Sequence, residues 1–216
     1  MNIIYQDNDI IVIDKPARLS VLPDGWEPEA PYVVKLLEPE FGRIWVVHRI
    51  DKVTSGVMVF ARNAEAHRAL NMQFEKHEEI KKYRAIVNGN PKWNEHTAKH
   101  PLRINVGHKH RTMVDEKQGK PSETQFTVIK RYQDYGLLVA TPRTGRTHQI
   151  RVHAYALGYP LLADTLYGAP PTDLIARPAL HAISLTLKHP VTGEQISFEA
   201  PYPEDFAQAL QRMNSE

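Results

Sequence analysis

The chain has 216 residues, of which 42% are hydrophobic and 24% charged, a balance typical of a globular protein and not of a disordered or fibrous one. It contains no cysteine, which excludes disulfides, thiolate zinc sites, iron–sulfur clusters and cysteine nucleophiles. The longest apolar run, near residues 57–61, is too short to cross a bilayer, and the N-terminus lacks the basic and apolar regions of a secretory signal. We therefore expect a cytoplasmic protein.

The first third of the chain predicts mostly strands. Short β-rich runs at residues 3–5 and 10–14 flank turn formers at 7–9. Six prolines and glycines between residues 20 and 45 predict a loop-rich excursion with a short helix at 32–37. A further strand is expected at 57–61.

Helices and strands follow in the rest of the chain. Asn63 is expected to cap a helix whose apolar stripe consists of Ala66, Leu70 and Phe74. Thr147 is expected to cap a second helix that ends at Gly158, and a last helix is expected at 203–213. Strands are predicted at residues 83–87, 125–132, 137–141, 184–188 and 195–199. The strands rarely alternate with helices, which favours an α+β fold with a mixed, largely antiparallel sheet and flanking helices.

Positive charge is concentrated in one stretch, although the formal net charge is only +2. Residues 76–131 carry thirteen Lys or Arg side chains against six Asp or Glu, and five histidines besides. Within it, residues 92–122 show little periodicity and predict an extended loop or irregular hairpin. A basic stretch is what contact with phosphates requires, but a solvated face without a ligand has the same composition. Charge alone leaves nucleic-acid binding and a plain solvated face both open.

Several common active-site motifs are missing from the sequence. There is no phosphate-binding G-x-x-x-x-G-K-[ST], no strand-linked G-x-G-x-x-G, no H-E-x-x-H and no G-x-S-x-G. The pairs His108 with His110 and His148 with His153 lack carboxylates at matched spacing, so we expect neither a metal site nor a cofactor. Two polar clusters stand out instead, at residues 48–56 and 144–153. A carboxylate so close to buried-looking segments needs a positive partner, so the clusters predict one carboxylate paired with one arginine.

Four segments match, in order, the motifs of a known family. Residues 48–56, HRIDKVTSG, resemble the H-R-L-D-x-x-T-S-G signature of the RluA-type pseudouridine synthases. Residues 82–89 resemble its K-x-Y-x-A-x-V-x-G segment, with the alanine one place early. Residues 144–153, TGRTHQIRVH, resemble T-G-R-x-H-Q-I-R-x-H, and residues 180–190 resemble the closing L-H-A … H-P segment. The sequence DKP at 14–16 also fits the family's N-K-P.

The resemblance extends over almost the whole chain and implies the catalytic fold of these enzymes. We expect residues 1–216 to form a single catalytic domain without the small N-terminal S4 domain of many relatives. Ile50 replaces the usual leucine, which is a conservative change. The implied activity is isomerisation of a uridine within RNA, in which uracil leaves C1′, rotates and returns through C5. This chemistry needs no redox change, metal or external energy source.

The resemblance also implies roles for individual residues. Asp51 matches the essential aspartate, acting as nucleophile or as base, and Arg151 matches the arginine that pairs with it. Tyr83 matches the active-site tyrosine that stacks on the base, although a tyrosine facing the core has the same pattern. Substrate binding is expected from His48, Arg49, Arg146 and Leu180, and from the basic residues Lys109 and Arg111, the last two on charge alone.

The expected partner is RNA, bound by a monomer at a uridine in a loop or bulge, where flipping a base out of its stack costs least. Whether that RNA is ribosomal RNA, transfer RNA or both stays open at this point. A non-catalytic RNA-binding or ribosome-assembly factor on the same fold is the alternative, and a metal-dependent hydrolase that uses the histidines is a third. The intact set of Asp51, Tyr83 and Arg151 favours the enzyme.

Overall fold

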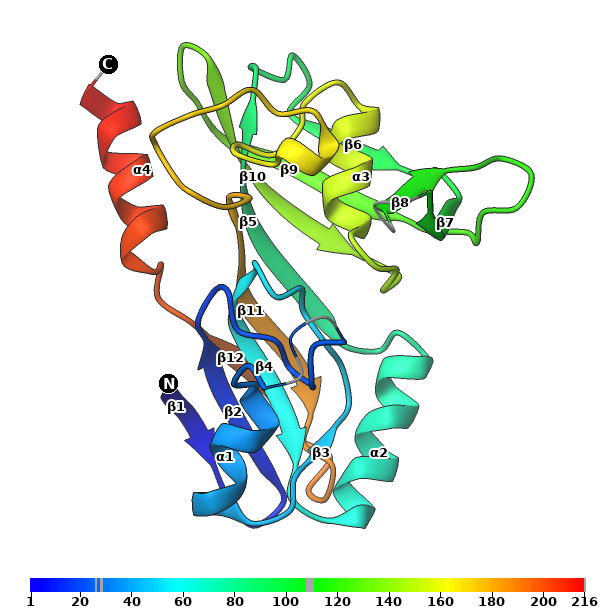
Figure 1. Ribbon diagram of the computed structural model, residues 1–216. Coiled ribbons are helices and arrows are strands. Elements are labelled where there is room, and N and C mark those ends of the chain that lie inside the picture. The colour runs from blue at the N-terminus through cyan, green and yellow to red at the C-terminus, as the bar shows by residue number, and fades with distance from the viewer. Residues whose placement is uncertain (26, 28, 108–110, 216) are drawn as a thin grey trace. The chain divides into compact units, whose positions relative to one another are not determined.

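The computed structural model describes residues 1–25, 27, 29–107 and 111–215, which form two compact units (Figure 1). The first unit contains Met1–Lys81 and Ala182–Pro201, and the second contains Lys82–His181 and Tyr202–Glu216. Strands β5 (Ile80–Asn88) and β11 (Leu180–Lys188) each include residues of both units. Within the described residues, no helix is long and apolar enough to span a membrane.

The first unit is a sheet whose strands β1, β2 and β4 lie side by side, with β11 next to β4. Its elements are β1 (Asn2–Gln6), β2 (Ile10–Lys15), α1 (Val33–Phe41), β3 (Trp45–Val46), β4 (Ser55–Ala61), α2 (Ala64–Glu75) and β12 (Gln195–Glu199). The pairs β1–β2, β2–β4, β3–β4 and β11–β12 are antiparallel. This arrangement confirms the strands predicted at 3–5, 10–14, 57–61, 184–188 and 195–199.

Helix α2 covers one face of this sheet. The Asn63 side chain accepts a hydrogen bond from the Ala66 amide at 2.8 Å and so caps the helix as predicted. Ala66 and Leu70 are fully buried in a cluster with Ile10, Val12 and other alternate strand residues. The stripe predicted from sequence is therefore the contact between helix and sheet.

Helix α1 runs four residues beyond the predicted end at residue 37. It continues through Pro39, which lacks only one intrahelical donor, and ends where the Gly42 amide donates to the Glu38 carbonyl at 2.9 Å. Gly42 has a φ of 67° and a ψ of −154°, a combination that glycine adopts without strain but that other residues avoid.

The second unit contains the antiparallel strands β5, β10, β9 and β6, in that order across the sheet. Its elements are β6 (Glu95–Ala98), β7 (Leu102–Val106), β8 (Arg111–Val114), β9 (Thr124–Arg131), β10 (Tyr135–Pro142), α3 (Gln149–Ala156), the short 3-10 helix η1 (Thr165–Tyr167) and α4 (Glu204–Ser215). The hairpin predicted at 125–141 is confirmed by the β9–β10 pair.

The irregular hairpin predicted within residues 92–122 is confirmed by β7–β8, whose register shifts between Arg103 and Val106, but strand β6 was not predicted. This segment contains β6, which pairs with β9, and the hairpin β7–β8. Strand β6 is a mostly exposed edge strand with the sequence EHTA, and β7 is exposed at its three central residues. Edge strands that are polar or exposed lack the alternating burial that a sequence pattern detects.

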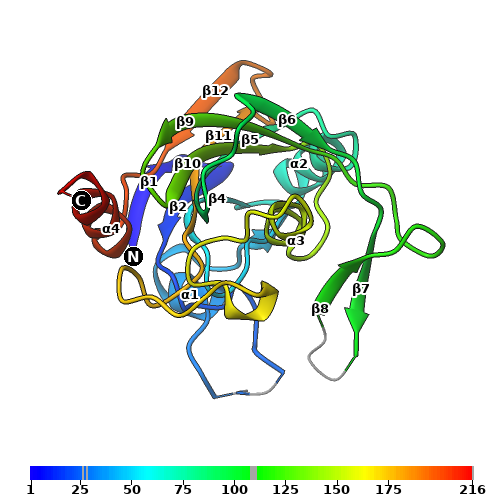
Figure 2. The same ribbon diagram turned by 90° about the horizontal axis from the view of Figure 1, so that it is seen from above.

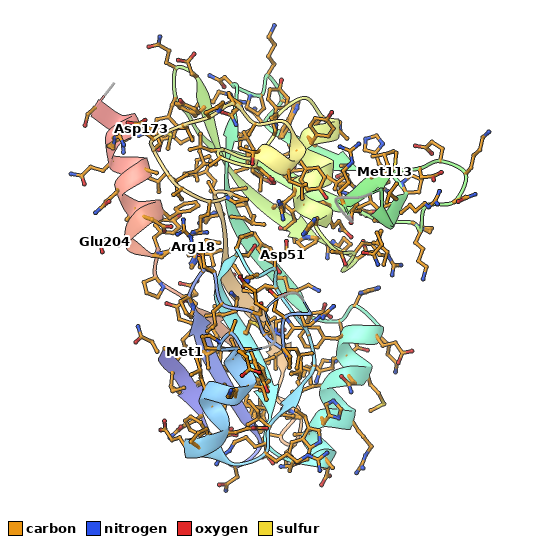
Figure 3. The ribbon with its side chains drawn as sticks, in the orientation of Figure 1. Met1, Arg18, Asp51, Met113, Asp173 and Glu204 are labelled. Atoms are coloured by element: carbon orange, nitrogen blue, oxygen red, sulfur yellow. The ribbon has the colours of Figure 1, made fainter. Side chains whose placement is uncertain are left out.

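Helix α4 closes the apolar core of the second unit. Phe206, Ala209 and Met213 pack with Ile86 and Leu162 in one buried cluster. Arg177 donates to both carboxylate oxygens of Asp205, at 2.7 and 2.9 Å. Asp173, labelled in Figure 3, accepts from Arg212 near the end of the helix. These two ion pairs attach α4 to the segment that precedes β11.

Candidate active site

Asp51 lies in a turn between β3 and β4, and its side chain is labelled in Figure 3. The residue is partly buried beside the buried Ile50, and its carbonyl accepts from the Thr54 amide at 3.0 Å. The tight turn explains why the polar residues of HRIDKVTS stand together between two apolar strands. It fixes the backbone at Asp51.

A fully buried lysine holds this turn. The ammonium of Lys15, at the end of β2, donates to the carbonyls of Pro16 and Leu19 at 2.8 Å and to that of Lys52 at 3.3 Å. A buried charge is tolerated only where acceptors surround it, and these carbonyls supply them. Lys15 therefore ties the end of β2 to the peptide that follows Asp51, which sequence reasoning did not predict.

Gly56 allows the strand after the turn to come close to β11. Its φ is 116°, and a Cβ built there would overlap the backbone of Ala182, lying 2.7 Å from the carbonyl carbon. Only glycine fits both the conformation and the space. The third residue of the T-S-G motif is thus explained by packing within the first unit.

His48 lies at the start of the motif and is bound inside the first unit. Its Nε2 accepts from the Val59 amide at 3.1 Å, and its ring stacks on Phe74 with centroids 4.7 Å apart. Burial, with the nearby Lys81 charge, lowers the pKa of His48 to about 3, so the ring is neutral. These contacts hold the segment that carries Asp51, while contact of His48 with substrate stays a prediction. The neighbouring Arg49 is exposed.

Tyr83 and Leu180 lie on strands of the second unit. Tyr83 is 9% exposed on β5, opposite Ala140 of β10. Leu180, 3% exposed, begins β11, and its carbonyl accepts from Arg177 at 3.1 Å. Both side chains are held by the regular backbone of their strands, and their contact with a base stays a prediction.

Arg151 of α3 makes a buried ion pair that the sequence did not reveal. Its Nε and Nη2 each donate to a carboxylate oxygen of Asp164, both at 2.7 Å, and the two residues are 5% and 0% exposed. The Tyr167 ring lies 5.1 Å from the guanidinium. The only sequence signal was an aspartate directly after the apolar residues 161–163.

The hydroxyl of Tyr167 joins three elements. It accepts from the Thr112 amide of β8 at 3.0 Å, and its own proton is available to Nδ1 of His148, 2.9 Å away. Burial raises the pKa of Tyr167, which keeps the phenol protonated. Tyr167 therefore connects the hairpin β7–β8, the start of α3 and Arg151.

The start of α3 differs from the prediction that Thr147 caps it. The N-cap is His148, in the left-handed conformation with φ 53°, and it makes no side-chain cap. Gln149 binds the preceding loop instead, because its Oε1 accepts from the Arg146 amide at 3.1 Å and from the Thr144 hydroxyl at 2.7 Å. An amide side chain bonding back to the preceding loop has no local sequence signature comparable to that of Asn63.

The histidines considered as metal ligands are hydrogen-bonded or lie outside the described residues. His153 is buried, with Nδ1 accepting from Thr124 at 2.9 Å and Nε2 donating to the His100 carbonyl at 3.1 Å. Burial lowers the pKa of His153 to about 4. His108, Lys109 and His110 lie outside the described residues, and Arg111 is exposed on β8. The hydrogen bond between His153 and Thr124 connects α3 to β9.

Comparison with known proteins places these features in a family. The sequence profile described as RNA pseudouridylate synthase matches residues 9–156. The ribosomal large subunit pseudouridine synthase D of Haemophilus ducreyi is 36% identical over 238 residues, covering 100% of this chain and 71% of that protein. The chain belongs to the RNA pseudouridylate synthase family. It is an isomerase that forms pseudouridine from uridine in RNA, as the sequence motifs predicted.

Further members of this family resemble the chain in sequence and in fold. The dual-specificity RNA pseudouridine synthase RluA of Escherichia coli K12 is 37% identical over 201 residues, covering 92% of each chain. The structure of human RNA pseudouridylate synthase domain containing 1 matches with a TM-score of 0.76 and 25% identity, covering 99% of this chain and 94% of that one. Human RNA pseudouridylate synthase domain containing 4 has the same fold, with a TM-score of 0.81 at 24% identity over 98% of this chain and 92% of that one. The α+β fold and the RluA-type assignment are confirmed.

Proposed function

We propose that this enzyme isomerises specific uridines in ribosomal RNA, transfer RNA or both, as a cytoplasmic monomer and without a cofactor. One relative is named for the ribosomal large subunit, which supports ribosomal RNA as a substrate, and another is named for dual specificity, which is consistent with more than one RNA substrate. We also propose that both units belong to one catalytic domain, since the family match at residues 9–156 includes parts of each.

In this proposal Asp51 is the essential catalytic group. An ionised carboxylate can attack the sugar as a nucleophile or remove a proton from it, and either step frees uracil from C1′. The observation that supports Asp51 most is the construction of its turn, in which a buried ammonium binds the Lys52 carbonyl and Gly56 permits close packing. A rigid backbone on both sides keeps a reacting group in a productive orientation.

The remaining residues are proposed to position the uracil base and to keep the catalytic carboxylate ionised. Tyr83 is proposed to stack on the uracil and to help take the C5 proton after reattachment, and Leu180 to line the uracil pocket. Arg151 is proposed to hold the catalytic carboxylate in its ionised form, which a guanidinium already locked by Asp164 can do without losing side-chain freedom. Arg49, exposed beside Asp51, is proposed to occupy the space that the flipped base leaves.

Mapping of pseudouridines identifies the substrate. Total RNA from cells with and without the gene is compared at nucleotide resolution, and cells that express Asp51→Asn serve as the matched control. We expect one or a few sites in ribosomal or transfer RNA to disappear in the deletion and to return with the wild-type gene but not with Asp51→Asn. Full restoration by a stably expressed Asp51→Asn protein would show that Asp51 is not the catalytic group.

A further inference from the structure

A groove of about 250 Å³ opens on the second unit, and Arg146, for which the resemblance implies substrate binding, is one of its lining residues. It lies beside the first half of β7, the turn at 118–120 and the turn at 145–147. Its lining residues are Leu102, Arg103, Ile104, Gln118, Lys120, Gly145, Arg146 and Thr147. Seen from above in Figure 2, the hairpin β7–β8 projects from the side of the unit that carries α3.

The charge of the groove is positive. Arg103, Lys120 and Arg146 line it, and none of its eight lining residues is acidic. The nearest described carboxylate partner is Asp115, whose Oδ2 lies 3.3 Å from Nη1 of Arg103 in an exposed ion pair. Exposed pairs of this kind are weak and exchange readily with other anions.

One guanidinium nitrogen of Arg146 has no acceptor among the described residues. The Nε of Arg146 is buried and makes no hydrogen bond to any of the described residues. A buried donor left unpaired destabilises a protein, so its presence calls for an explanation such as a functional role or a bound water or ion. A ligand in the groove would meet the side chains of both Arg146 and Lys120, which line it from separate turns.

The turn that carries Lys120 is rigid. The Asp115 carboxylate accepts from the amides of Lys117 and Gln118 at 3.0 and 2.9 Å, and Lys120 pairs through its backbone with Leu102 at 2.9 Å in both directions. Gly119 packs so closely that a Cβ would lie 2.6 Å from the carbonyl carbon of Pro101. The Lys120 backbone is therefore positioned before any ligand arrives.

The opposite turn is equally fixed. The Gln149 side chain binds the Arg146 amide, and its Nε2 donates to the Glu123 carbonyl at 2.9 Å. Thr144 adds a hydrogen bond from the Glu123 amide to its hydroxyl at 3.1 Å. Because both turns are fixed before binding, less conformational entropy is lost when a ligand enters the groove.

We propose that this groove binds a backbone phosphodiester of the substrate RNA, at a nucleotide other than the target uridine. Arg146 and Lys120 contact the phosphate oxygens, Arg103 turns from Asp115 to the same strand, and the exposed Ile104 packs against the adjoining ribose or base. RNA is the anion that this enzyme must bind, and a groove with both cationic and apolar walls suits a nucleotide unit. The proposal rests on the proposed function and adds a binding site for the RNA strand outside the uridine pocket.

Two lysines of one turn allow a matched test. Lys117 and Lys120 are both exposed, but only Lys120 lines the groove. The affinity of Lys117→Ala, Lys120→Ala and wild type for an RNA stem-loop containing a mapped target uridine is measured across a salt series. Removing one phosphate-binding cation lowers the salt slope by about 0.7 for single-stranded RNA. We expect that change and a weaker affinity for Lys120→Ala, and wild-type values for Lys117→Ala.

A second measurement tests the chemical nature of the ligand. A set of stem-loops is prepared in which each carries one neutral methylphosphonate at a different position of the strand. The affinity of wild type and of Lys120→Ala is measured for each stem-loop. We expect one or two positions to weaken binding to wild type and to have no further effect on the variant, which is the coupling expected of a direct contact. Equal salt slopes for the two lysine variants, or equal methylphosphonate profiles for wild type and Lys120→Ala, would overturn the groove proposal.

The wild-type enzyme is assayed in parallel for pseudouridine formation on the same stem-loop. No product from any mapped RNA would contradict the proposed function itself. Product formation together with unchanged RNA binding by Lys120→Ala would overturn the groove proposal alone, so the two failures are distinguishable.

Discussion

Arg151 and Asp164 form a two-pronged ion pair in which both N–O distances are 2.7 Å and both side chains are almost completely buried. The pair joins α3 to the segment just before η1. Buried pairs of this kind are expensive to break from one side, because the remaining charge loses the partner that compensates its burial.

The first prediction separates the structural role of this pair from its chemical role. Arg151→Ala and Asp164→Ala should each lower the free energy of unfolding by about 3–5 kcal/mol. The double variant Arg151→Met/Asp164→Leu should recover most of that stability, because apolar groups of similar volume replace both charges. Urea unfolding measures the stability, and pseudouridine formation should stay abolished in the double variant. A stable double variant that is fully active would show that Arg151 is not needed for the reaction.

The second prediction concerns the Tyr167 hydroxyl. Tyr167→Phe keeps the ring beside Arg151 but removes the acceptor of the buried Thr112 amide and the hydrogen bond to His148. Leaving a buried donor unsatisfied should cost about 1–3 kcal/mol, which corresponds to a fall in Tm of about 2–4 °C per kcal/mol for a chain of this size. Tyr155→Phe is the control, because Tyr155 of α3 is 52% exposed. Equal melting temperatures for the two variants would argue against the network.

The third prediction is that acid destabilises the protein through His48. Its folded pKa of about 3 lies below the value of about 6.5 in the unfolded chain, so between these values the unfolded chain binds the extra proton. The contribution of neutral His48 to the free energy of unfolding is fully present at a pH well above 6.5. It should fall as the pH drops below 6.5, by up to about 1.4 kcal/mol per pH unit. Urea unfolding between pH 7 and pH 5 should show a shallower slope for His48→Phe than for wild type. His96→Phe, which changes an exposed histidine, should retain the wild-type slope.

The fourth prediction tests the glycine of the T-S-G motif. Gly56→Ala should destabilise the first unit strongly, since the φ of 116° alone costs an alanine about 1–3 kcal/mol and the overlap with Ala182 adds to it. Gly25→Ala should have little effect, because nothing lies within 4 Å of its Cβ position. Thermal melting compares the two. A Gly56→Ala protein as stable as Gly25→Ala would mean that β4 and β11 separate without cost.

Much of this protein was determined by its sequence alone. Strands β2 and β4 are short, nearly continuous apolar runs, and α2 has both a side-chain cap and an apolar stripe, so local patterns predicted all three. The family and the reaction also followed from sequence, because the motifs around Asp51 and Arg151 combine residue types that a core or a surface alone would not select.

Other features depended on residues far apart in the chain that only the tertiary structure brings together. Lys15 reaches the Lys52 carbonyl across 37 positions, and the Tyr167 hydroxyl reaches the Thr112 amide across 55. The groove likewise needs three separate segments, from β7 and from the turns at 118–120 and 145–147. A buried ammonium or phenol is stabilised by whichever acceptors and donors surround it, and no local pattern encodes those partners. The sequence therefore determined which chemistry the protein performs, while only the folded chain decided which side chains hold the reacting groups in place.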